Sequence, residues 1–133
     1  MNILDGVIVS LSSSSALSSV CVESFGEMFE VLTIDTPQSN PMLDVGKEVT
    51  LAFKESDVVL SPVKIPFSSC MFEGVVTKVQ RGEILLSVTI QRGEKEIQAL
   101  LSSQTSSWVK EGEGVYGYIS PHNIFFLKGH DGE

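Results

Sequence analysis

Two short motifs in the first half of the chain carry residue types that bind anions. Thr36-Pro37-Gln38-Ser39 places two hydroxyls three residues apart at the start of a predicted helical turn. Free backbone N–H groups and the positive end of the helix dipole favour an anion there. Lys54-Glu55-Ser56 ends a predicted strand, and the two-residue alternation of a strand turns Lys54 and Ser56 to the same side. The plainer interpretations are a helix cap and a solvated lysine, and both stay open.

The second half repeats only part of this chemistry. Ser102-Ser103-Gln104-Thr105 keeps a pair of hydroxyls, but Ser120-Pro121-His122 stands where the first half has its lysine motif. If this half binds an anion, His122 must supply the donor, and affinity would fall as the pH rises through about 6.5. The alternative is that His122 is only a turn residue after Pro121 and that this site has been lost.

No pattern in the chain indicates catalysis. The two histidines, His122 and His130, lie far in sequence from the cysteines, and no nucleophile elbow, P-loop or zinc-protease motif occurs. We therefore expect a protein that is not an enzyme.

The net charge, the hydropathy and the cysteines argue against several further classes of protein. With 17 acidic and 9 basic side chains the net charge is −8, which disfavours direct binding to nucleic acid or to an anionic membrane. No apolar run is long enough to span a bilayer. Cys21 and Cys70 form no disulfide framework or zinc motif, so we expect reduced, buried thiols. No basic residue precedes the apolar stretch 7–21, which argues against a secretory signal and favours a cytoplasmic location.

The elements that must position these motifs are predicted to be short strands. Segments rich in Val, Ile, Phe and Thr recur between Gly, Asn, Asp and Pro, which is typical of an all-β protein. Two other segments, 37–43 and 103–109, follow Ser/Thr-rich starts and are each expected to form a single helical turn or a short helix. The predicted strands are 6–11, 19–23, 28–34, 49–54, 58–60, 74–79, 84–91, 96–101, 115–119 and 124–127.

An internal repeat with a period of about 67 residues divides the chain. Gly6 matches Gly74, and Gly46 matches Gly112. Each half then has five strands and one short helix, the element count of an OB-type Greek-key barrel. We expect two tandem five-stranded OB-like barrels, residues 1–63 and 64–133, joined by an extended connector containing Pro62 and Pro66.

The order and spacing of several short motifs resemble the tandem Mop/TOBE (molbindin-like, di-Mop) domains. The matching motifs are Asn2-x-x-x-Gly6, Ser19-Val20, Thr36-x-x-Ser39, Leu43-x-x-Gly46-x-x-Val49 and Lys54-x-Ser56-x-Val58. The resemblance implies that molybdate or tungstate binds in clefts between neighbouring barrels, held by backbone amides and by Ser, Thr and Lys side chains. It also implies a homo-oligomer, a dimer or trimer. The site residues so implied are Ser19, Thr36, Ser39, Lys54, Ser56, Ser102, Thr105 and His122.

The function expected from this resemblance is reversible binding of a tetrahedral oxyanion for intracellular storage, homeostasis or sensing. Such a site rejects a protonated anion such as phosphate and must separate sulfate by size. The alternative is an oligomerisation or interaction module, such as the regulatory domain of a transcription regulator or transporter ATPase, whose oxyanion site has decayed. The incomplete motifs of the second half support that alternative.

Overall fold

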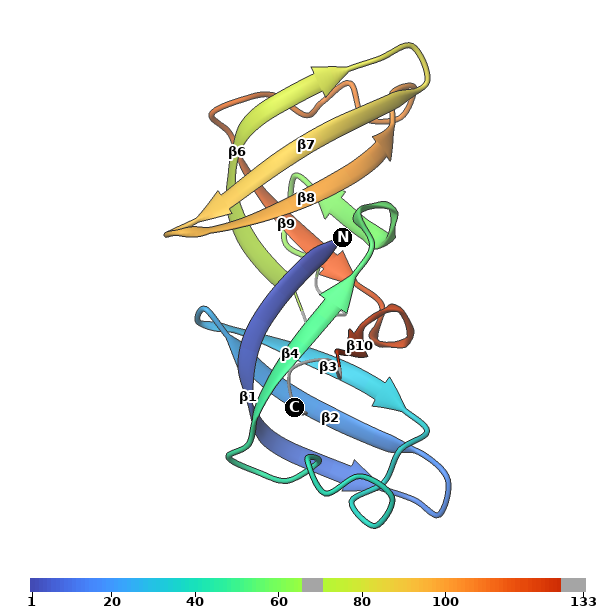
Figure 1. The fold of residues 1–133 in the computed structure, drawn as a ribbon. Coiled ribbons are helices and arrows are strands. Elements are labelled where there is room, and N and C mark those ends of the chain that lie inside the picture. The colour runs from blue at the N-terminus through green and yellow to red at the C-terminus, as the bar shows by residue number, and fades with distance from the viewer. Residues whose placement is uncertain (66–70, 128–133) are drawn as a thin grey trace. The chain divides into compact units, whose positions relative to one another are not determined.

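The structure, a computed structural model, describes residues 1–65 and 71–127. Strands dominate this part of the chain, and the only helices in it are two single 3₁₀ turns (Figure 1). All ten predicted strands are present, most of them longer by one to several residues than the sequence pattern indicated. The elements are β1 (Asn2–Ser13), β2 (Ser18–Ser24), β3 (Glu27–Thr33), β4 (Glu48–Phe53), η1 (Glu55–Asp57), β5 (Val58–Ser61), β6 (Met71–Arg81), β7 (Leu85–Arg92), β8 (Lys95–Ser102), β9 (Gly114–Ile119), η2 (Pro121–Asn123) and β10 (Phe125–Phe126).

The strands form two five-stranded sheets, in the orders β10-β4-β1-β2-β3 and β5-β9-β6-β7-β8. Consecutive hairpin strands pair antiparallel, as in β1–β2, β2–β3, β6–β7 and β7–β8. In each sheet the two edge strands also contact each other, so that the sheet curls into a partly open barrel. This confirms the predicted all-β architecture of two OB-like units.

The two compact units are discontinuous in sequence. Unit 1 contains residues 1–2 and 54–119, and unit 2 contains residues 3–53 and 120–133. Segment 54–61 belongs to the first half of the sequence, but its strand β5 pairs with β9 of the second half. Segment 120–127 belongs to the second half, but its strand β10 pairs with β4 of the first half. Each unit therefore contains residues from both sides of the expected domain boundary between residues 63 and 64. Sequence could not show this, because the exchanged segments occupy equivalent places in the repeat.

Backbone details reproduce the internal repeat. A bulge interrupts β1 between Ile8 and Ser10, and another interrupts β6 between Val76 and Lys78. Gly46 and Gly112 both have a left-handed backbone, with φ of 89° and 87°. Their N–H groups donate to the carbonyls of Ile8 and Val76 over 2.8 and 2.7 Å. Glycine adopts this φ without strain, so both halves need glycine at this turn.

Strand alternation builds a separate core in each unit. In β2 and β7 every second side chain is buried, because successive residues point to opposite faces of a strand. The largest fully buried side chains of unit 2 are Leu4, Ile8, Phe29, Leu51 and Phe53, and those of unit 1 are Phe72, Leu86, Ile90 and Ile119.

The prediction of short helices at 37–43 and 103–109 is wrong. Both segments form hydrogen-bonded turns, and the only helical residues in the described ranges are those of η1 and η2. Pro41 explains the first case, because proline donates no hydrogen bond and disfavours helical backbone at the preceding Asn40. In the second, five Ser and Thr residues between 102 and 107 compete for backbone hydrogen bonds.

Candidate functional site

A pocket lined by hydroxyl groups lies within unit 1, at the gap between the edge strands β5 and β8. We call it the hydroxyl pocket; its volume is about 320 Å³. Residues of η1, β5, β8 and the turn after β8 contribute to it. It is lined by Ser56, Val58, Val59, Leu60, Leu100, Leu101, Ser102, Thr105, Ser106 and Trp108.

The hydroxyl pocket joins predicted site residues from both halves of the sequence. Ser56 comes from the first half, whereas Ser102 and Thr105 come from the second. They meet because η1 and β5 are part of unit 1, where η1 contacts β8. The sequence motifs place Ser56 and Thr36 in one half and Ser102 and His122 in the other. The exchange of segments instead brings Ser56 to the same pocket as Ser102 and Thr105.

Hydroxyl groups make up most of the polar side chains that line this pocket. In the described part of the chain, the side chains of Ser56, Ser102, Thr105 and Ser106 have no hydrogen-bond partner. The first three are exposed, but Ser106 is only 6% exposed. A buried hydroxyl without a partner costs about 1–3 kcal/mol. The arrangement therefore offers several donors to a guest that can only accept hydrogen bonds.

Ser106 is a residue that sequence reasoning missed. The Ser/Thr-rich stretch 102–107 was visible, but its residues are chemically alike. The turn decides which of them is buried: Ser106 accepts a backbone hydrogen bond from Val109 over 3.2 Å and is buried, while its neighbour Ser107 is exposed. No local signal separates these two serines before the chain is folded.

Lys54 does not line the hydroxyl pocket. Strand β4 ends at Phe53, and Lys54 continues with extended backbone into η1, so strand alternation does not relate it to Ser56. Its side chain is exposed and has no ion-pair partner in the described ranges. The neighbouring Glu55 carboxylate accepts a hydrogen bond from the Met1 ammonium, which lowers the pKa of Glu55. No charged side chain lines the pocket.

The equivalent motifs in unit 2 satisfy their own hydrogen bonds. The N–H of Thr36 donates to Ser39 Oγ over 2.9 Å, and Ser39 Oγ donates to the Thr36 carbonyl over 3.1 Å. Ser120 Oγ lies 3.3 Å from His122 Nδ1. Neither pair lines the pocket that lies between β3 and β10 in unit 2. Thr36 and Ser39 therefore hydrogen-bond to each other within one turn.

Ser19 is also occupied by a protein partner. Its hydroxyl donates to Glu30 Oε2 over 2.6 Å, across the β2–β3 pair. A carboxylate at this distance repels an anion. The structure therefore places Ser19 apart from Ser56, Ser102 and Thr105.

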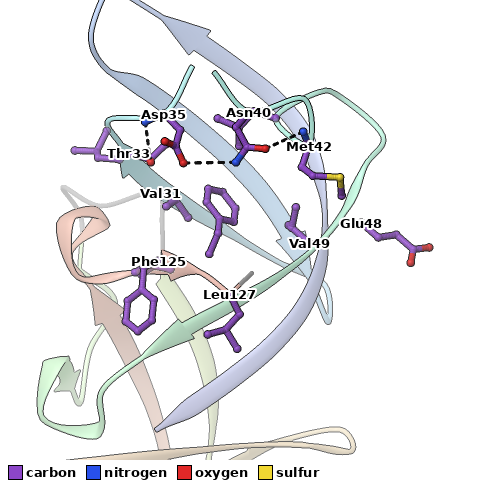
Figure 2. A pocket seen from close by; sticks show the side chains of 13 residues that line it. Val31, Thr33, Asp35, Asn40, Met42, Glu48, Val49, Phe125 and Leu127 are labelled. Carbon is purple, nitrogen blue, oxygen red and sulfur yellow. Dashed lines mark hydrogen bonds between the residues drawn. The ribbon is translucent and has the colours of Figure 1, made fainter. Parts of the chain in front are cut away.

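Unit 2 has its own pocket at the corresponding gap, between β3 and β10 (Figure 2). We call it the acidic-rim pocket; its volume is about 210 Å³. Two carboxylates line it and no Lys, Arg or His does. Figure 2 shows Asp35 and Asn40 directed toward each other, with Asn40 Nδ2 donating to Asp35 Oδ2 over 3.5 Å. The lining residues are Val31, Leu32, Thr33, Asp35, Asn40, Met42, Leu43, Glu48, Val49, Ile124, Phe125, Phe126 and Leu127.

Other kinds of site find no support in residues 1–65 and 71–127. No group of three or more His, Cys, Asp or Glu side chains is arranged to hold a metal ion there. Cys21 is a free thiol and is half-buried rather than buried, while Cys70 lies outside the described residues. The described part of the chain also has no helix of the length and hydropathy needed to cross a membrane.

Comparisons with known proteins give a match in structure but none in sequence. No family model matches the chain, and no curated protein matches it. Among solved structures, the fold is similar to that of the cytoplasmic molybdate-binding protein ModG in a crystal form with molybdate bound. The TM-score is 0.85 at 20% sequence identity, and the match covers 94% of each chain. At this identity, the likeness establishes the fold.

Proposed function

We propose that this chain reversibly binds a tetrahedral oxyanion, molybdate or tungstate, in the hydroxyl pocket of unit 1. The observation that carries the proposal is the meeting of Ser56, Ser102 and Thr105 around the buried, unpartnered hydroxyl of Ser106. The shared fold with a protein that binds molybdate supports the choice of ligand.

The chemistry of the pocket suits a fully deprotonated dianion. Each hydroxyl can donate one hydrogen bond, and the oxygens of molybdate or tungstate only accept them. Hydrogen bonds to a charged group contribute about 1.5–3 kcal/mol each. The lining residues include no carboxylate that would repel the guest. Sulfate has the same shape and also carries no proton, so size must separate it from molybdate.

Lys54 offsets part of the anion's charge in this proposal. It stands two residues before Ser56, on the same exchanged segment, and its exposed side chain is long and flexible. The ammonium can move toward an anion bound at Ser56 without being part of the pocket wall. The remaining predicted residues, Ser19, Thr36, Ser39 and His122, are not assigned to this site.

In the cell, the protein would store, buffer or sense the oxyanion in the cytoplasm as a homo-oligomer, a dimer or trimer, and would catalyse no reaction. The competing function is an interaction module without a working site. The internally satisfied Thr36–Ser39 and Ser120–His122 pairs favour that alternative for unit 2.

Thermal unfolding with and without millimolar molybdate, tungstate, sulfate and phosphate tests the proposal. A ligand at 100 times its Kd stabilises a protein by about 2.7 kcal/mol, which shifts the Tm by about 5–10 °C for a chain of this size. Trp108, the single tryptophan of the chain, lines the pocket, so its fluorescence reports on the same binding.

A double variant, Ser56→Ala with Ser102→Ala, is expected to lose most of the shift. Ser12→Ala, an exposed serine of unit 2, is the matched control and should keep it. If no anion shifts the Tm of the unmodified protein, the interaction module becomes the better explanation.

A further inference from the structure

We infer that the acidic-rim pocket of unit 2 is a second binding site, which takes a small molecule with an apolar ring or chain and one ammonium group. This inference does not depend on oxyanion binding in unit 1. It follows from the lining of the pocket, which is apolar inside and carries acidic groups at its rim.

The interior of the pocket is built from core side chains. Val31, Leu43, Val49 and Ile124 are buried and form apolar walls. At about 210 Å³ the space exceeds an engineered apolar cavity of about 150 Å³ that binds benzene in another protein. An aromatic ring or a short branched chain therefore fits the interior without moving the core.

The rim supplies acceptors for a cation. Asp35 Oδ2 accepts only the long hydrogen bond of 3.5 Å from Asn40, and its other oxygen has no partner in the described part of the chain. Figure 2 places Thr33, Asp35 and Asn40 together on one side of the pocket. Glu48, exposed at the start of β4, also lines the pocket, but Figure 2 shows its carboxylate directed away from Asp35. An ammonium group therefore has the Asp35 carboxylate as its charged acceptor, and it can donate up to three hydrogen bonds.

The same features exclude an oxyanion from this pocket. No cationic side chain lines it, two carboxylates do, and residues 3–53, the first segment of unit 2, carry 7 acidic groups against 1 basic group. Moreover, the residues that correspond to those of the hydroxyl pocket are engaged in the hydrogen bonds of the Thr36–Ser39 turn. The two pockets of the duplicated fold have therefore diverged toward ligands of opposite charge.

Titration of the full chain with benzylammonium, benzyl alcohol and benzoate, followed by two-dimensional NMR or calorimetry, tests this inference. Benzylammonium is expected to bind at least about fivefold more tightly than the neutral alcohol, and benzoate should not bind. Because the contact is ionic, benzylammonium affinity should fall as salt is added. Equal binding of the alcohol or of benzoate, or no binding of any probe, would overturn the inference.

The matched variants are Asp35→Asn and Glu30→Gln. Both remove one carboxylate from unit 2 and keep an oxygen acceptor, but Glu30 does not line the pocket and accepts its bond from Ser19. Asp35→Asn should weaken benzylammonium about tenfold, whereas Glu30→Gln should leave it nearly unchanged. An Asp35→Asn variant that folds normally and binds as tightly as the unmodified chain contradicts the assignment. The response to molybdate in the same samples tests the hydroxyl pocket separately.

Discussion

At the scale of single residues, substitution of Ser106 can show whether this residue binds the ligand or stabilises the fold. Its hydroxyl is buried and has no partner in the described residues, so the folded protein gains nothing from it when the pocket is empty. A serine whose hydroxyl stabilised the turn would add to the free energy of unfolding even when the pocket is empty. Removing the Ser106 hydroxyl therefore lowers the affinity for the ligand if the residue binds it, and lowers the stability of the empty protein if the residue is structural.

We expect Ser106→Ala to leave the free energy of unfolding of the empty protein unchanged, or to raise it by about 1 kcal/mol, because an unpaired buried hydroxyl is removed. Affinity for molybdate should fall about tenfold. Ser107→Ala is the matched control, because Ser107 is the exposed neighbour and does not line the pocket. Denaturant titration and calorimetry measure the two quantities. A destabilised variant with unchanged affinity would show that Ser106 is structural.

Lys54 gives a second prediction at this scale. Because its side chain is exposed and makes no hydrogen bond or ion pair in the described structure, Lys54→Ala should keep the unmodified Tm. Loss of one charge-assisted contact should weaken molybdate about tenfold. Lys110→Ala removes an exposed lysine that does not line the pocket and should bind normally. Full affinity of Lys54→Ala would remove this lysine from the site.

At the scale of the elements, the close approach of β6 and β7 requires glycine at one position of β6. A Cβ added at Gly74 would lie 2.7 Å from Ile90 Cγ2 and 2.8 Å from the Gln91 carbonyl oxygen, both on β7. A backbone carbonyl in a paired strand cannot move aside cheaply. The neighbouring strand β9 has a glycine with room for a methyl group, since the nearest atom to a Cβ at Gly114 is the Gly74 carbonyl oxygen at 3.9 Å, an ordinary van der Waals distance.

Gly74→Ala is therefore expected to destabilise the protein by about 1–3 kcal/mol, the usual cost of overpacking. Gly114→Ala should change the free energy of unfolding by much less. Chemical denaturation of the two variants makes the comparison. Equal stability of both would mean that β6 and β7 are less tightly packed than described.

At the scale of the whole molecule, the exchange of segments predicts how a separated half behaves. A single residue, Lys54, with extended backbone joins β4 to η1, so the chain has little slack to turn back onto its own sheet. The first half alone keeps β1 to β4 but lacks β10, and its β5 lacks β9. Two copies of this half can supply each other with the missing edge strand, because the repeat makes the segments equivalent.

We expect residues 1–65, expressed alone, to form a dimer by exchanging segment 54–61. Light scattering coupled to size exclusion measures its mass, and the dimer should dissociate and unfold together on dilution and heating. A Pro substitution in β5, Val59→Pro, should weaken the dimer, because it interrupts the edge strand. A stable, cooperatively folded monomer would show that the half can close on itself.

Several features of this protein were determined by local sequence. The positions of ten strands, the duplicated plan and the two turn glycines Gly46 and Gly112 follow from side-chain alternation and from glycine spacing, which act over a few residues. The predicted short helices are absent because Pro41 and the run of hydroxyl residues, which also act locally, favour turns.

Only the tertiary structure decided which segment completes which sheet. In a duplicated chain, segments 54–61 and 120–127 have the same pattern, so periodicity cannot tell whether each pairs within its own half. That choice brings Ser56 to Ser102 and Thr105, and folding of the turn buries Ser106 rather than Ser107. Pairing between distant strands and burial within a turn depend on contacts across the fold, and a linear sequence does not display those contacts.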